Sequence, residues 1–283
     1  MKIIECPRDA MQGLNGFIPT TRKIDYLNQL LEVGFDTIDF GSFVSPKAIP
    51  QMRDTSEVVK HLEWKTSQSG LLAIIANVRG AQEASAFEGI RYLGFPMSIS
   101  ETFQKRNTNK SIPEALNELE QIGEICRESG KKLVTYISMG FGNPYGDPYD
   151  VDIVDQFVGL LITLNCKIIS LADTVGAAES QQIFSLFDRL STRYPGVELG
   201  AHLHATPDTA QSKIKAAFEA GCKRFDGALK GFGGCPMARN ELVGNVATEL
   251  IIEFLQEQRV QTTIDQKKLG DALKMAAEIF PKS

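Results

Sequence analysis

The sequence predicts a closed (β/α)8 barrel, and three observations support this fold class. Short strand-like runs alternate with segments of helical periodicity along the 283 residues, and crossovers of helical length imply a parallel sheet. Eight such units in fewer than ~300 residues favour a closed barrel over an open doubly wound sheet. No Gly-x-Gly-x-x-Gly follows the first strand-like run, which removes the commonest reason to choose a dinucleotide-binding fold.

The strand-like runs are short, rich in apolar and β-branched residues, and bounded by turn residues. They cover residues 2–5, 36–40, 71–75, 94–98, 132–137, 167–171, 198–202 and 224–229. The clearest helical segments are amphipathic or begin at a turn or capping residue. They cover residues 21–33, 112–129, 150–164, 179–193, 207–220 and 244–255. A further stretch, 268–279, predicts an extra helix that covers the barrel, and the chain 1–283 is expected to form a single catalytic domain without a linker.

Composition and charge exclude several classes of protein. The chain has 35 acidic and 30 basic residues, a net charge of −5, and 43% hydrophobic residues, which argues against a general binder of nucleic acid or anionic membranes. No apolar run approaches the ~18 residues of a membrane span, and the first residues leave no room for a signal peptide, so we expect a cytoplasmic protein. Five scattered cysteines without a Cys-x-x-Cys pair predict reduced, mostly buried thiols.

Polar residues follow three of the predicted strands at the end where a barrel carries its site. Arg8 and Asp9 follow the first strand, His202 and His204 end the seventh, and a glycine-rich loop with Cys235 follows the eighth. Closure of the barrel places the eighth strand beside the first. These three strand ends are therefore expected to be consecutive neighbours in space.

The His202-x-His204 pair indicates a metal site. Residues at i and i+2 of a strand point to one face, although two hydrogen-bonded core histidines would give the same pattern; the third histidine, His61, is expected on the surface. Asp9 and Asn245 would add two oxygen ligands. Two nitrogen and two oxygen donors without a thiolate suit Mg2+ or Mn2+ with positions open to substrate oxygens.

Arg8 and Cys235 are candidates for catalytic roles beside that site. Arg8 could hold an oxyanion with its fork of donors, or it could be an ordinary salt-bridge partner. Cys235 stands next to Gly231, Gly233 and Gly234, which allow sharp turns and loop movement. A buried apolar cysteine is the alternative, but the neighbouring candidate ligands favour a reactive thiol.

The sequence resembles the 3-hydroxy-3-methylglutaryl-CoA lyase family over nearly its whole length. The motifs that carry the resemblance are residues 7–9 with Gln12, 42–47, 50–52, 98–109, 170–174, His202 with His204, and 233–236. The Ser-Phe-Val-Ser-Pro-Lys block and the Gly-Gly-Cys-Pro loop are specific to the lyase branch. The Arg-Asp and His-x-His pairs are shared with the wider superfamily of metal-dependent barrel lyases and synthases.

The resemblance implies divalent-metal-dependent cleavage of an acyl-CoA to acetyl-CoA and acetoacetate, by a homodimer. It implies that Asp9, His202, His204 and Asn245 hold the metal. Arg8 would stabilise the enolate of the departing thioester, Cys235 would act in proton transfer, and His202 would also belong to the catalytic group. The residues implied in substrate binding are Arg8, Gln12, Ser42, Asn107, Ser170, Asp173 and Thr174.

The sequence departs from the family pattern near the site. Gly13, Leu14 and Asn15 stand in place of an Asn-Glu-Lys triplet, so a lysine expected near the acyl group is missing. Asp39 stands in place of a glutamate, Asn143 in place of a cysteine, and Ala205 in place of an acidic or amide residue. One extra residue separates Cys235 from Asn245. The candidate ligands match the family pattern, whereas the residues that would support them differ. This combination predicts a substrate with a different acyl group or a weaker enzyme.

Two other functions remain open at this stage. The first is a related synthase or aldolase, for example one that condenses acetyl-CoA with a 2-oxo acid; Cys235 and its loop speak for the lyase. The second is a non-catalytic barrel that binds a metal and an acyl-CoA. Arg8 and Cys235 argue against it, because binding alone would need neither.

Overall fold

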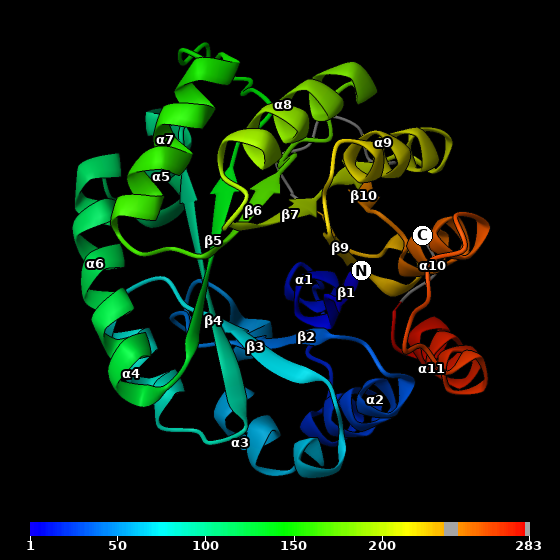
Figure 1. The fold of residues 1–283 in the computed structure, drawn as a ribbon. Helices are drawn as coiled ribbons and strands as arrows, with labels where there is room; N and C mark the ends of the chain where they lie inside the picture. The colour runs from blue at the N-terminus through cyan, green and yellow to red at the C-terminus, as the bar shows by residue number, and fades with distance from the viewer. Residues whose placement is uncertain (235–242, 281–283) are drawn as a thin grey trace.

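The computed structural model, which describes residues 1–234 and 243–280, contains a closed barrel of eight parallel strands. In order around the barrel these are β1 (Lys2–Glu5), β2 (Thr37–Ser42), β3 (Gly70–Ile74), β4 (Ile90–Ser98), β5 (Lys132–Ser138), β6 (Ile168–Ala172), β7 (Glu198–His202) and β9 (Arg224–Gly227). β1 pairs with both β2 and β9, which closes the ring (Figure 1). The predicted fold class is confirmed.

Helices surround the barrel and join successive strands. The helices around the strands are α2 (Thr20–Val33), α3 (Thr55–Lys60), α4 (Val78–Ser85), α5 (Glu101–Thr108), α6 (Ile112–Ser129), α7 (Val151–Thr163), α8 (Ser180–Arg193), α9 (Pro207–Glu219), α10 (Thr248–Glu257) and α11 (Gln266–Ile279). Short 3-10 turns lie at η1 (Pro50–Met52), η2 (Trp64–Thr66) and η3 (Leu229–Gly231). The expected extra helix is α11, which packs against α2 on the outside of the barrel.

Local chemistry accounts for the helix boundaries. At the start of α6, the Ser111 hydroxyl accepts from the Glu114 amide and the Glu114 carboxylate accepts from the Ser111 amide, a reciprocal capping box. The helix ends at Gly130, whose φ of 70° is a left-handed conformation that glycine adopts without strain. The face of Leu119 and Ile122 is buried against the barrel. The predicted range of this helix, 112–129, is confirmed.

Three sequence-based boundaries near the strand ends are wrong. The fourth strand begins at Ile90 rather than at residue 94, because residues 90–93 already pair with β3. The eighth strand ends at Gly227 rather than at residue 229, because Leu229 already begins the 3-10 turn η3. Residues 244–245 do not begin a helix: as β10 (Gly244–Asn245) they pair antiparallel with β8 (His204–Ala205), and α10 begins only at Thr248.

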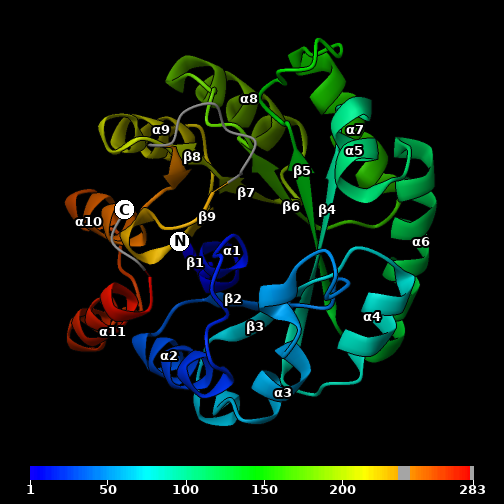
Figure 2. The same ribbon diagram turned by 180° about the vertical axis from the view of Figure 1, so that it is seen from behind.

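A short helix directly after β1, α1 (Pro7–Gln12), was not predicted from the sequence. Pro7 at its first turn fixes a helical φ, and Ala10 and Met11 are buried. Six residues are too few for a periodicity signal, so packing decides this helix. Seen from either side, α1 lies within the outline of the barrel (Figure 2). It carries Arg8 and Asp9 toward the ends of β7 and β9.

Two apolar layers make the scaffold rigid. Inside the barrel, side chains of β3 to β6 form a small cluster made of Leu72, Ile74, Tyr92, Val134, Tyr136 and Ile168. A larger cluster fills the space between the strands and the helices. The interior is thus a packed core, which leaves the mouth at the strand ends for the site.

Glu5 gives the fold a testable pH dependence. Its carboxylate is buried and accepts hydrogen bonds from the Leu229 amide (2.9 Å) and the Thr248 hydroxyl (2.5 Å). Burial raises its pKa from 4.5 to about 8. A raised pKa makes the folded state bind the proton more tightly than the unfolded state. Its stabilising contribution is therefore complete below pH 4.5 and is lost as the pH rises through 8.

We expect Glu5→Gln to remove this contribution, which amounts to at most about 1.4 kcal/mol per pH unit for one proton. The free energy of unfolding, measured by urea titration between pH 5 and 8, should fall less steeply in the variant than in the parent protein. Glu253→Gln, on the exposed side of α10, is the matched control. Equal slopes in the Glu5→Gln variant and the parent would contradict the expectation.

Candidate active site

The candidate site lies where β1, β7 and β9 end side by side. β9 pairs with β7 on one side and with β1 on the other, so the expected adjacency of the three strand ends is confirmed. His202 is the last residue of β7, and His204 belongs to β8. Asn245 of β10 is paired directly with His204. The small β8–β10 sheet therefore brings Asn245 to the two histidines from 41 positions further along the chain.

Asp9, His202 and His204 converge in the structure. Their potential ligand atoms all lie within 4.8 Å of one another, and the two imidazole rings are 5.3 Å apart between centroids. Asp9 and His204 are buried, and His202 is partly exposed at the mouth. A buried carboxylate therefore faces both imidazole rings.

Hydrogen bonds on the far side orient both imidazole rings. The Nδ1 atom of His202 lies 3.2 Å from the Asp226 carboxylate, and that of His204 lies 3.0 Å from the backbone oxygen of Thr174. Both partners are acceptors, so each Nδ1 carries the hydrogen, and in the neutral form of each ring Nε2 keeps its lone pair. The His204 Nε2 is buried and has no hydrogen-bond partner among residues 1–234 and 243–280.

Sequence reasoning missed Asp226, which orients His202. The signal that could have found it is the position of Asp226 on the predicted last strand, next to the strand that ends at His202. The pairing of these two residues in register depends on barrel closure, so local periodicity does not reveal it. The role of the Thr174 backbone oxygen was equally hidden, since no side-chain pattern marks a carbonyl group.

Asp9 is held as an ionised acceptor. One of its oxygens accepts from Arg8 and Gln12, each at 2.9 Å, and the other accepts from the Asn245 amide at 2.7 Å. Burial acts to raise its pKa, but the charges of Arg8 and the two histidines together with the Asn245 hydrogen bond lower the pKa of Asp9 to about 2. Asp9 therefore carries a negative charge at neutral pH.

The Arg8 guanidinium is fixed by three neighbours. Its Nε and Nη2 atoms donate to the Asp39 carboxylate at 3.0 and 2.5 Å. Its Nη1 atom donates to the Asp9 carboxylate and to the side-chain oxygen Oε1 of Gln12, each at 2.9 Å. Asp39 is the residue that is one methylene shorter than the family's glutamate, yet it reaches Arg8. The bulge in β2 between Asp39 and Gly41 lies at this point. Burial raises the pKa of Asp39 to about 6.

The expected substrate-binding residues differ in whether their polar groups already have hydrogen-bond partners within the protein. Ser42 ends β2, and its hydroxyl accepts from the Val44 amide at 3.2 Å. The Ser170 hydroxyl is buried and has no hydrogen-bond partner in the described part of the chain. The Thr174 hydroxyl accepts from the Met139 amide at 2.7 Å. Gln12 contacts both Arg8 and Asp9.

Two of these residues stand apart from the convergent group. The Asp173 carboxylate pairs with Lys213 at 2.7 Å, and the same ammonium group donates to the His204 backbone oxygen at 2.8 Å. This buried ion pair anchors the backbone that carries His204. Asn107 is exposed near the end of α5.

Cys235 lies outside the described residues, so its position is not assigned. The glycine two residues before it is closely packed: a Cβ added to Gly233, whose φ is +83°, would lie 2.7 Å from the backbone of both Asp9 and Ala10. Only glycine allows this approach without strain. The start of the cysteine loop is therefore held directly against Asp9.

The remaining departures from the family pattern have local structural roles or lie at the rim. Asn143 is a turn residue whose side chain accepts from the Tyr145 and Asp147 amides. Ala205 pairs with Gly244 between β8 and β10. Gly13 and Leu14 directly follow α1, and Gly13 is exposed.

Comparisons with known proteins agree with this geometry. The HMGL-like family model matches residues 2–276. A hydroxymethylglutaryl-CoA lyase of Bacillus subtilis is 34% identical over 98% of this chain and 91% of its own length. A 3-hydroxy-3-isohexenylglutaryl-CoA/hydroxymethylglutaryl-CoA lyase of Pseudomonas aeruginosa is 31% identical over 98% of this chain and 91% of its own length.

The solved structures agree as well. An HMG-CoA lyase of Acinetobacter baumannii, in complex with coenzyme A and 3-methylmalate, superimposes with a TM-score of 0.90 at 30% identity, over 99% of this chain and 90% of that one. The family match extends over almost the whole chain, and the fold and the likeness in sequence extend equally far. This chain belongs to the HMGL-like family.

Proposed function

We propose that this protein is a hydroxymethylglutaryl-CoA lyase, which cleaves 3-hydroxy-3-methylglutaryl-CoA to acetyl-CoA and acetoacetate. The observation that carries the proposal is the convergence of Asp9, His202 and His204 beside the fixed Arg8 guanidinium. Full-length relatives of the same name support it. They do not favour a condensing synthase, an aldolase or a non-catalytic barrel.

The donor set fits a divalent cation. The orphaned Nε2 of His204, the Nε2 of His202 and the Asp9 carboxylate supply two neutral nitrogens and one anionic oxygen. The Asn245 amide nitrogen already donates to Asp9 and to the Phe232 backbone oxygen, so its carbonyl oxygen is the atom that would face the ion. We assign Mg2+ or Mn2+ on the basis of this oxygen and imidazole set.

The reaction needs two kinds of stabilisation. A bound divalent ion would lower the pKa of the tertiary hydroxyl group of the substrate and neutralise the charge on its oxygen. The tertiary hydroxyl group gives its proton to a base, and as the C–C bond breaks the former alcohol carbon becomes the ketone of acetoacetate. The bonding electron pair passes to the CH2 group of the thioester, which leaves as an enolate and takes up a proton to become acetyl-CoA.

Arg8 is proposed to stabilise that enolate. Its guanidinium is already held by Asp39, Asp9 and Gln12, so no reorganisation is needed as negative charge develops on the thioester oxygen. An arginine in this position stays protonated throughout, since the charges of Asp39 and Asp9 raise its pKa above the ordinary value against the effect of burial. Arg8 therefore acts as an electrostatic group and not as a proton donor.

The remaining roles follow the sequence motifs. Cys235 is proposed to deliver the proton to the enolate carbon, and its loop is anchored beside Asp9 through Gly233. Ser42, Asn107, Ser170, Asp173 and Thr174 are proposed to contribute to the acyl-CoA site together with Gln12 and Arg8. The complex of the Acinetobacter relative with coenzyme A supports an acyl-CoA substrate.

The remaining expectations concern the location, the partners and the acyl chain of the substrate. No helix in the described part of the chain is long and apolar enough to cross a membrane. A homodimer, a cytoplasmic location and the absence of nucleic-acid and membrane partners stay predictions. The Pseudomonas relative is named for two acyl-CoA compounds, so a longer acyl chain is the first alternative substrate to try.

The test is release of acetyl-CoA and acetoacetate from 3-hydroxy-3-methylglutaryl-CoA by metal-free protein, with and without added Mg2+ or Mn2+. We expect turnover only with the ion, and a loss of at least ~100-fold in Cys235→Ala. No turnover by a folded protein that still binds the ion would exclude the methylglutaryl substrate. The same assay with the isohexenyl compound would then decide between a shifted acyl group and another reaction.

A further inference from the structure

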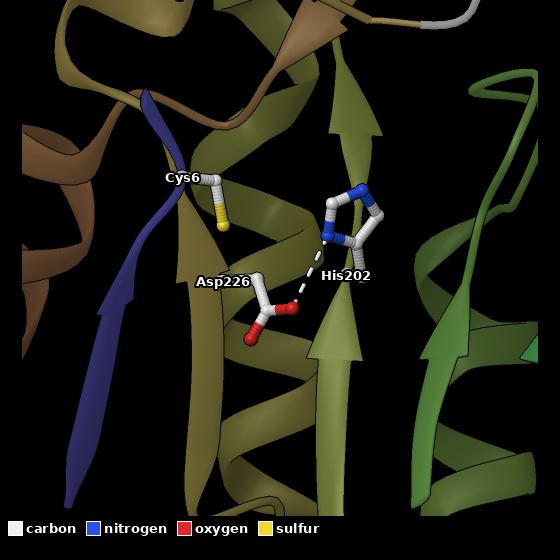
Figure 3. Close-up of side chains that lie close together, drawn as sticks. All are labelled: Cys6, His202 and Asp226. Atoms are coloured by element: carbon white, nitrogen blue, oxygen red, sulfur yellow. Dashed lines mark hydrogen bonds and ion pairs between the residues drawn. The ribbon is translucent and has the colours of Figure 1, made fainter. Parts of the chain in front are cut away.

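A second cluster of potential ligands lies behind His202. Cys6 follows β1, Asp226 lies on β9, and His202 ends β7, so the three come from neighbouring strands. Their potential ligand atoms are all within 4.8 Å of one another. Figure 3 shows the three side chains pointing toward one another, with the Nδ1 atom of His202 3.2 Å from an Asp226 oxygen. The Cys6 amide donates to the Gly227 backbone oxygen, which fixes the cysteine beside β9.

Two of these side chains have bonding capacity to spare. The second oxygen of Asp226, Oδ1, is buried and has no hydrogen-bond partner among residues 1–234 and 243–280; Arg224 Nε is 3.8 Å away, which is beyond hydrogen-bond length. Among the described residues, the Cys6 thiol makes only a long contact of 3.9 Å with the Ile4 backbone oxygen. A fully buried carboxylate oxygen without a partner is costly, and a bound cation would relieve that cost.

We propose that Cys6, His202 and Asp226 form a second metal site, one that takes a thiophilic divalent cation of the zinc class. One sulfur, one imidazole nitrogen and one carboxylate oxygen are donors typical of such ions and not of Mg2+. A tetrahedral ion would hold its ligand atoms roughly 3.2–3.7 Å apart. Because the ligand atoms of the cluster lie at most 4.8 Å apart, they need to approach one another by at most about 1.1–1.6 Å.

The charges also balance. A Cys6 thiolate and the Asp226 carboxylate together carry two negative charges, which match a divalent ion. The Arg224 guanidinium lies in ion-pair range of Asp226 at 3.8 Å and also pairs with Glu198 at 3.2 Å. His202 provides the way in, since its side chain is 13% exposed at the mouth whereas Asp226 is fully buried. A small cation could thus reach the cluster by way of the histidine.

The two metal sites would compete for His202. An ion on Nδ1 moves the ring hydrogen to Nε2, and a neutral imidazole then has no lone pair left for an ion held by Asp9 and His204. A thiophilic cation bound at Cys6 would therefore weaken the binding of the catalytic ion. This consequence rests on the proposed function; the existence of the second site does not.

Co2+ is the probe, because thiolate ligation gives it a strong charge-transfer absorption in the near ultraviolet. The titration uses metal-free full-length protein with Cys235→Ser, which removes the cysteine proposed as the proton donor, and cleavage is assayed separately in protein that keeps Cys235. We expect one equivalent of Co2+ to produce the absorption, Cys6→Ser to abolish it, and Asp226→Asn to weaken Co2+ binding at least ~10-fold. Cys222→Ser, at another buried thiol, is the matched control and should keep the absorption.

The outcomes separate this site from the proposed lyase site. In His204→Ala the absorption should persist, because His204 is not a ligand of the second site, whereas metal-dependent cleavage should be lost when His204→Ala is made in protein that keeps Cys235. Rising Mn2+ should weaken the binding of Co2+ measured by the same absorption. Absence of the absorption, or its survival in both Cys6→Ser and Cys6→Ala, would overturn the second site. Failed cleavage with an intact absorption would overturn the lyase proposal alone.

Discussion

Replacing His204 by alanine is expected to reduce metal-dependent cleavage of the acyl-CoA by at least ~100-fold. His204 Nε2 is buried, has no hydrogen-bond partner among residues 1–234 and 243–280, and is oriented by the hydrogen bond between the ring Nδ1 and the Thr174 backbone oxygen. Without it, the ion would be held by one imidazole instead of two. The measurement is kcat/KM against Mn2+ concentration, together with direct Mn2+ binding by electron paramagnetic resonance.

His61→Ala is the matched control for this substitution. His61 is exposed at the end of α3 and far in sequence from every candidate ligand, as the sequence predicts for a surface histidine. It should keep both Mn2+ binding and turnover. A His204→Ala protein that binds Mn2+ with unchanged affinity would show that the convergent group is not the metal site.

Replacing Arg8 by lysine should lower kcat by roughly 10²–10³-fold, the effect of losing one preorganised donor to a developing oxyanion. Lysine keeps the charge but loses the fork that holds Asp39, Asp9 and Gln12 at once. Because the interaction is proposed to form only as the C–C bond breaks, kcat should fall much more than KM rises. Steady-state kinetics at saturating Mn2+ separate the two quantities.

The same change at Arg127, which is exposed on α6 and paired with Glu124, controls for an arginine-to-lysine change as such. Mn2+ binding by the Arg8→Lys protein reports whether Asp9 is still in place. A variant with normal kcat and a raised KM would assign Arg8 to substrate binding instead of enolate stabilisation.

The sequence alone predicted the barrel, the order of its strands and the part of the molecule that carries the site. These features are local: strand and helix periodicities are written in short windows, and alternation along a strand puts His202 and His204 on one face. Adjacency of the first and last strands then follows from closure. For the same reason Arg8 and Asp9 could be placed near the histidines without any coordinates.

The tertiary structure decided what holds these side chains in place. Asp226 reaches His202 across 24 positions, the Thr174 backbone oxygen reaches His204 across 30, and Asp39 reaches Arg8 across 31. Each contact depends on strand register and on side-chain packing between elements that are distant in sequence, and no short window records either. The helix α1 and the β8–β10 pair were unpredictable for a related reason: they are too short to show a period, and burial against the barrel mouth stabilises them.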